Sequence, residues 1–213
     1  MKTNIKKDLE EIIKILVEME HLKNSIKELT NEKEEYFDLV VKKSHFYHKV
    51  YVNYVKVFVI DVYKLMAERE AYNFKNLLKN CINNIDESNP DKNLTNIKFQ
   101  NLLKDFESIY DKYFQMINEH RNKYYAHTDR NKEKYEFGYP TEELFEILCV
   151  FQKIYSALNE YYNNKPLFVV LDNKPNEIVN SYKYFKIKKL YIESLKNNNT
   201  KIDVELIGDI IHD

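Results

Sequence analysis

The sequence predicts an all-α protein, an up-down bundle of four to five core helices. Only two glycines and four prolines occur in 213 residues. That is too few for the turns of a β-sheet protein or of alternating strands and helices. Apolar residues instead recur at intervals of three and four over long stretches, which is the period of an amphipathic helix. The length suits one hydrophobic core with an appendage.

The first two helices are expected at residues 5–29 and 46–66. Charged residues separate the apolar positions of the first, which are Ile5, Leu9, Ile12, Ile13, Leu16, Met19, Ile26 and Leu29. Asn31 followed by Glu34 is a helix-start signal. The second helix is rich in valine and is expected to be central. Its apolar positions are Phe46, Val50, Tyr54, Val57, Phe58, Val62, Leu65 and Met66.

A shorter helix is expected at residues 74–85, followed by a loop. Its apolar positions are Phe74, Leu77, Leu78, Cys81, Ile82 and Ile85. The polar segment 86–93 contains Pro90, which cannot continue a helix without breaking a backbone hydrogen bond. The sequence therefore predicts a connection there.

The next helix carries a heptad seam that is predicted to face a partner helix or another subunit. The seam consists of Phe99, Leu103, Phe106, Tyr110, Tyr113 and Ile117. The same rhythm continues onto His120, Tyr124 and His127. Because these residues are polar or amphipathic, the helix is expected either to leave the core there or to line a site.

The last core helix is expected to begin near Thr141, an N-cap residue followed by Glu142 and Glu143. It runs to Tyr162 and ends before Pro166. The expected domain division is a bundle over residues 1–165 and an extension over 166–213 that packs on it. Residues 166–175 fit an extended segment or hairpin arm, residues 176–196 suit a helix, and residues 201–211 suit a helix or a strand.

Composition excludes several classes of protein. The net charge is -1 and 44% of the residues are hydrophobic, which disfavours a disordered chain, a membrane-spanning protein and a uniformly basic nucleic-acid coat. The N-terminal segment lacks the apolar run of a signal peptide, so a cytoplasmic location is expected. Cys81 and Cys149 stand far apart and are interpreted as buried thiols in a reducing compartment.

No cofactor or metal is expected. Glu18 and His21 form one E-x-x-H pair on the first helix, whereas a di-iron bundle requires two such pairs and further carboxylates. His45 and His48 can share a helix face but have no convincing acidic or cysteine companions. Two glycines are also insufficient for a glycine-rich phosphate loop.

Residues 120–130 read HRNKYYAHTDR and contain Arg121, five intervening residues and His127. The chain has 30 lysines but only three arginines, at positions 69, 121 and 130. The string resembles the HEPN superfamily, whose signature is arginine, four to six residues and histidine, with a polar residue directly after the arginine, here Asn122. The AHTD tail and residues 61–80 look like its AbiU-type abortive-infection branch. The resemblance covers residues 40–160.

The resemblance implies a compact helical bundle that dimerises through the motif helices and, in many members, a metal-independent endoribonuclease. The side chains of His127 and Arg121 suit that chemistry independently of the resemblance. RNA supplies the 2′-OH nucleophile, and His127 can act as general acid or base because its ordinary pKa is near working pH. Arg121 can grip two phosphate oxygens through its planar fork.

The spacing of Arg121 and His127 favours a dimeric active unit. Six residues turn a helix by about 600 degrees, which places the two side chains about 120 degrees apart. They can act together if the helix ends or kinks near His127, or if two copies meet at a two-fold axis and pool their side chains. Asn122 is a catalytic candidate that would orient His127 or a phosphate.

Further residues are candidates for substrate binding. Tyr124 and Tyr125 would stack on bases or merely pack, and His120 is interpreted chiefly as a histidine of the seam. Lys123 and Arg130 would guide a phosphate backbone or remain solvated. Asp129 occupies the position where toxins silenced by an adenylylating antitoxin carry tyrosine, so that regulation is not inferred. Asp129 would instead bond the His127 ring or backbone.

The expected function is that of a toxin or abortive-infection effector that cleaves RNA. The alternative is a non-catalytic, dimeric helical module that binds RNA or a partner protein, such as an antitoxin or a defence complex.

Overall fold

The structure is a computed structural model that describes residues 5–32, 37, 41–85, 91–125, 141–163, 184, 186–189 and 192. By its internal contacts the chain divides into two units, Met1–Ile26 with Val52–Val169, and Lys27–Tyr51 with Val170–Asp213. The domain boundary expected near residue 165 and the strand considered for the extension lie outside the described residues. Both stay predictions.

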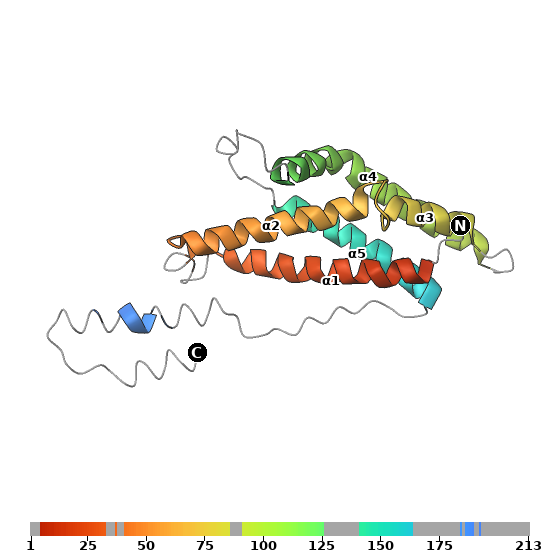
Figure 1. The fold of residues 1–213 in the computed structure, drawn as a ribbon. Helices are drawn as coiled ribbons and strands as arrows, with labels where there is room; N and C mark the ends of the chain where they lie inside the picture. The colour runs from red at the N-terminus through yellow and green to blue at the C-terminus, as the bar shows by residue number, and fades with distance from the viewer. Residues whose placement is uncertain are drawn as a thin grey trace. The chain divides into compact units, whose positions relative to one another are not determined.

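The prediction of an all-α helical bundle is confirmed. The described helices are α1 (Ile5–Leu29), α2 (His45–Met66), α3 (Phe74–Asn83), α4 (Lys92–Tyr125) and α5 (Thr141–Asn163). Helix α1 runs antiparallel to α2, and α4 runs antiparallel to α5 (Figure 1). None of the described helices is both long and apolar enough to cross a membrane.

The core of the first unit is formed by the apolar faces of all five helices. Phe151 of α5 is fully buried, and its ring centroid lies 5.1 Å from that of Phe74 of α3 and 6.4 Å from that of Phe106 of α4. The face that α1 buries includes Leu9, Ile12, Leu16 and Met19. Because aromatic side chains bury large apolar areas, the contacts among Phe74, Phe106 and Phe151 hold α3, α4 and α5 to one another.

The buried face of α4 differs in part from the predicted heptad seam. Four seam positions are buried, namely Phe99, Phe106, Tyr113 and Ile117. Leu102 and Ile109 are buried as well, whereas the predicted Leu103 and Tyr110 are only half-buried. A straight helix drifts about 20 degrees per heptad from a strict 3.5-residue repeat. Helix α4 also contacts both α3 and α5, so its buried face is wider than a two-helix seam.

Polar pairs also join α4 to α5 beside the buried face. The Tyr113 hydroxyl donates to a Glu146 carboxylate oxygen at 2.6 Å, and Lys153 Nζ lies 2.7 Å from Asp105 Oδ2. The hydrogen bond from Tyr113 is the main cause that lowers the pKa of Glu146. Pairs near the surface contribute little to stability because water screens them, so apolar burial remains the dominant contribution.

The cysteines behave differently from each other. Cys81 is buried as expected, and burial raises the pKa of its thiol to about 11. Cys149 is exposed, so the prediction that both thiols are buried is wrong for this residue. It directly follows the buried Leu148 on α5, and one step along a helix turns a side chain by about 100 degrees away from the core.

Candidate functional site

The predicted site residues fall at the C-terminal end of α4 and beyond it. His120, Arg121 and Asn122 are described with their side chains, and the first two are half-buried whereas Asn122 is exposed. For three candidates the structure describes only the helical backbone, and these are Lys123, Tyr124 and Tyr125. Three more lie outside the described residues, namely His127, Asp129 and Arg130.

Arg121 lies against an aromatic ring of a different helix. Its guanidinium carbon is 4.8 Å from the centroid of the Tyr63 ring, and Tyr63, on α2, is only 3% exposed. Arg121 Nη1 also donates to Asn122 Oδ1 at 3.1 Å, and Asn122 Nδ2 donates to Asn118 Oδ1 at 3.4 Å. The cation is therefore held by a ring face and an amide, both of which are uncharged.

A second arginine reaches the same tyrosine. Arg69, exposed in the turn between α2 and α3, donates from Nε and Nη2 to the Tyr63 hydroxyl oxygen at 3.1 and 2.5 Å. Its guanidinium carbon lies 5.8 Å from the ring centroid. Two of the three arginines of the chain thus meet at Tyr63. Neither Arg69 nor Tyr63 is predicted from the sequence, although the scarcity of arginine that marks Arg121 marks Arg69 equally.

The turn that carries Arg69 is held in place by Asn73. This N-cap side chain accepts the N–H of Asn76 at 2.8 Å, which begins α3. Its amide nitrogen donates to the backbone oxygens of Glu68 and Glu70 at 3.2 and 2.7 Å. Because Asn73 is 2% exposed, one buried amide both caps α3 and fixes the backbone on either side of Arg69.

A stack of aromatic rings extends from Tyr63 along α4. Phe114 lies 6.0 Å from Tyr63 with an interplanar angle of 18°, and Tyr110 lies 4.4 Å from Phe114 at 12°. Lys75 of α3 places its Nζ 5.5 Å from the Tyr110 centroid and pairs with Glu68 at 2.5 Å. The stack therefore packs α2 against α4 and has cations at both of its ends.

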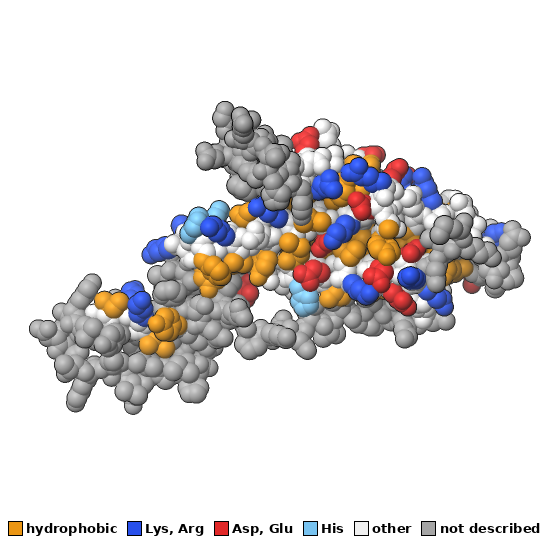
Figure 2. All heavy atoms as spheres, in the orientation of Figure 1, with side chains coloured by type: hydrophobic (Ala, Val, Ile, Leu, Met, Phe, Trp, Pro, Cys, Tyr) orange, Lys and Arg blue, Asp and Glu red, His pale blue; other side chains and the backbone are white. Residues whose placement is uncertain are grey.

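The two arginines differ electrostatically from the lysines around them. Within the described part of the chain, no ion pair involves Arg69 or Arg121, whereas lysines of α4 and α5 pair with Glu146, Asp105 and Glu160. Charges of both signs are interspersed on the face shown in Figure 2. The positive charge at Tyr63 is thus local and is not neutralised by a paired carboxylate.

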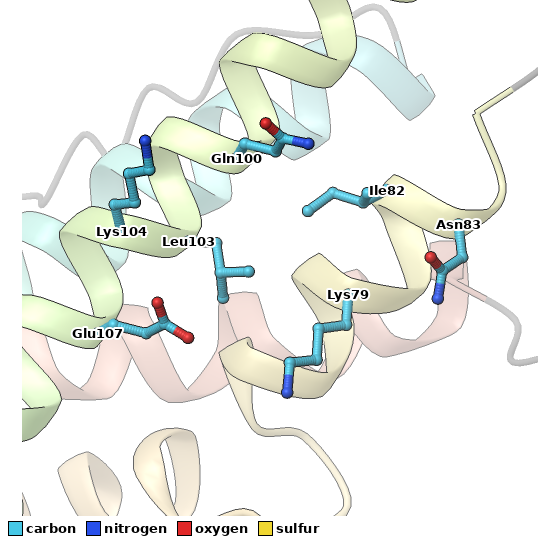
Figure 3. Close-up of a pocket in the computed structure, with 7 residues that line it drawn as sticks. All are labelled: Lys79, Ile82, Asn83, Gln100, Leu103, Lys104 and Glu107. Carbon is cyan, nitrogen blue, oxygen red and sulfur yellow. The ribbon is translucent and has the colours of Figure 1, made fainter.

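Two hollows away from Tyr63 are lined by side chains of other kinds. A groove of about 510 Å³ lies between α3 and α4, and in Figure 3 Gln100 and Ile82 point toward one another across it. Its lining includes Lys79 and Lys104 but no histidine or cysteine. In the second unit, His45 and His48 line an open hollow of about 560 Å³. Among the described residues, no three His, Cys, Asp or Glu side chains come together as metal ligands would.

No protein-family model matches the chain, and neither does any curated protein or solved structure.

Proposed function

We propose that the chain is a metal-independent endoribonuclease of the HEPN type that acts as a toxin or abortive-infection effector. The observation that carries the proposal is Arg121, which lies at the C-terminal end of the longest described helix of an all-α bundle, with its guanidinium held only by uncharged groups. His127 follows it in the motif order that the superfamily uses.

In the proposed reaction, the 2′-oxygen of a ribose attacks the adjacent phosphorus and the bond from phosphorus to the 5′-oxygen breaks. One histidine accepts the 2′-proton and another donates a proton to the leaving oxygen. The products are a 2′,3′-cyclic phosphate and a 5′-hydroxyl. His127 of each copy in a dimer supplies one of these groups, and Arg121 stabilises the crowded phosphorane through its planar fork.

The test uses the purified full chain, RNA and excess EDTA. We expect cleavage in the chelator with cyclic-phosphate ends, and we expect His127→Ala and Arg121→Lys to lose both cleavage and toxicity in cells while keeping the dimer. His21→Ala, which alters an exposed histidine of α1, is the matched control and should cleave normally. Cleavage that disappears with chelator, or that survives in His127→Ala, would contradict the proposal.

A second candidate is a non-catalytic helical module that binds RNA or a partner protein. The contact between Arg121 and Tyr63 favours it, because a cation on a ring can serve solely to join α4 to α2. In that case overexpression is harmless, the chain cleaves no RNA, and Arg121→Ala lowers the melting temperature. Intact RNA bound in a salt-dependent manner would distinguish an RNA-binding module from one that binds protein.

A further inference from the structure

We propose that Arg69 and Arg121 of one chain form a two-arginine clamp for a phosphate of bound RNA, and that Tyr63 is the positioning residue of this clamp. The inference rests on the proposed function for the identity of the ligand. It adds a binding residue, Arg69, from outside the motif. It also means that each chain brings two guanidiniums of its own, so that the second arginine need not come from another copy.

The first support is the direction of the contacts that Tyr63 makes. Arg69 donates hydrogen bonds from Nε and Nη2 to the hydroxyl oxygen of Tyr63. The guanidinium of Arg121 lies over the ring of Tyr63. Each guanidinium has more N–H donors than these contacts use. The remaining donors of Arg69 belong to an exposed side chain, and they are therefore accessible to a ligand.

The second support is the charge of the partners. A carboxylate is the partner that would hold a guanidinium most strongly in a purely structural role, because charge-assisted and bidentate hydrogen bonds are the strongest that it can make. Arg69 and Arg121 instead contact a phenol, a ring face and an amide. Glu68, which is next to Arg69 in sequence, pairs with Lys75. Two guanidiniums thus contact one tyrosine, with their carbons 5.8 and 4.8 Å from its ring centroid, and neither is paired with a carboxylate, which favours binding of an anion.

The third support is rigidity. Tyr63 is buried and stacked on Phe114, and the turn that carries Arg69 is pinned by Asn73 on both sides. A site ordered before the ligand arrives loses less conformational entropy on binding. A phosphodiester presents two anionic oxygens, and planar guanidinium forks match that geometry better than the point charge of lysine.

The experiment measures binding of a short fluorescent 2′-O-methyl oligonucleotide of random sequence to the full chain. This probe lacks the attacking hydroxyl, so binding is read independently of cleavage. We expect Arg69→Ala and Arg121→Ala each to weaken binding about tenfold. Each should also reduce the slope of log affinity against log salt by about 0.7, the value for one phosphate contact on a single strand.

Two further variants separate charge from position. Arg69→Lys keeps the charge and should restore the salt slope but only part of the affinity. Tyr63→Phe keeps the ring stack and removes the hydroxyl, so it should weaken binding about threefold through loss of order in Arg69, with little change in the melting temperature. Lys79→Ala removes an exposed cation of α3 and is the matched control, which should bind as the unaltered chain does.

The possible outcomes distinguish the clamp from the proposed reaction. If Arg69→Ala binds as tightly as the unaltered chain with the same salt slope, or if the unaltered chain does not bind the probe, the clamp is wrong. If the arginine variants weaken binding while the unaltered chain cleaves no RNA, the clamp stands and the ribonuclease proposal fails. If RNA is cleaved and Arg69→Ala alters neither binding nor cleavage, only the clamp fails.

Discussion

Asp61 is a carboxyl group buried among apolar residues of α2, with 5% of its surface exposed. Burial raises its pKa, and the hydrogen bond from Lys64 at 2.7 Å lowers it by less. Glu18 of α1 adds a like charge that raises the pKa further. The native protein therefore binds the Asp61 proton more tightly than the unfolded chain does, and ionisation of this group opposes folding.

We expect Asp61→Asn to raise the free energy of unfolding at neutral pH. Above both pKa values the wild-type protein has to bury a charge that the amide lacks. As the pH falls below the unfolded value of about 3.9, aspartic acid becomes neutral in both states and the advantage of the variant disappears. Urea unfolding of both proteins across this range measures the difference. A wild-type protein that gains stability over the variant as the pH rises would contradict the assignment.

At the residue scale, Arg121 and Asn122 are adjacent on α4 and share a hydrogen bond, while the catalytic roles that the sequence suggests for them stay predictions. The sequence did not identify Tyr63, because a tyrosine within an apolar helical series reads as an ordinary core residue. Its ring contacts two arginines that lie outside α2. Only distances between separate elements reveal these contacts.

At the scale of elements, the helices follow the local signals closely. The predicted ranges 5–29 and 46–66 agree with α1 and α2 within one residue, and α5 begins at Thr141 as its capping signal predicts. Capping residues, prolines and the 3.6-residue period act within a few positions of one another. The extent of each helix is therefore largely a local property. The face that a helix buries depends instead on its neighbours, because the buried face of α4 differs in part from the seam that its spacing predicts.

The buried face of α4 is testable by a pair of leucine variants. Leu102 is 4% exposed, whereas the predicted seam residue Leu103 is half-buried at the groove between α3 and α4. We expect Leu102→Ala to lower the free energy of unfolding by about 2–5 kcal/mol, because it leaves a cavity. Leu103→Ala should cost less than half as much. Chemical denaturation compares the two variants. A larger loss of unfolding free energy for Leu103→Ala would contradict this assignment of the buried face and support the seam that the sequence predicts.

At the scale of the whole molecule, the seam has a consequence for assembly. Its buried residues pack within the chain, among them Phe106 against Phe151 and Phe99 against Tyr161. The seam is therefore satisfied by a helix of the same chain, which is one of the two partners that the sequence allowed. The proposed assembly of two copies would therefore use other surfaces, with the motif helices as the proposed interface.

We expect sedimentation equilibrium of the full chain to give twice the mass of one chain, because a single helix separates Arg121 and His127 by about 120 degrees and a two-fold axis can reunite them. Arg121→Lys should sediment like the unaltered protein. A stable monomer that cleaves RNA at full rate would exclude the requirement for a dimer. It would leave the clamp of Arg69 and Arg121 intact, since both arginines belong to one chain.

Periodicity, capping and composition are local or additive properties, so they are enough to predict the helical class, the approximate extent of the helices and an arginine near the end of α4. The tertiary structure decided which side of α4 is buried and that Arg69 meets Arg121 at Tyr63. Those outcomes depend on how α2, α3 and α4 pack against one another. Packing is set by the fit of whole helix faces, which no spacing within one helix encodes.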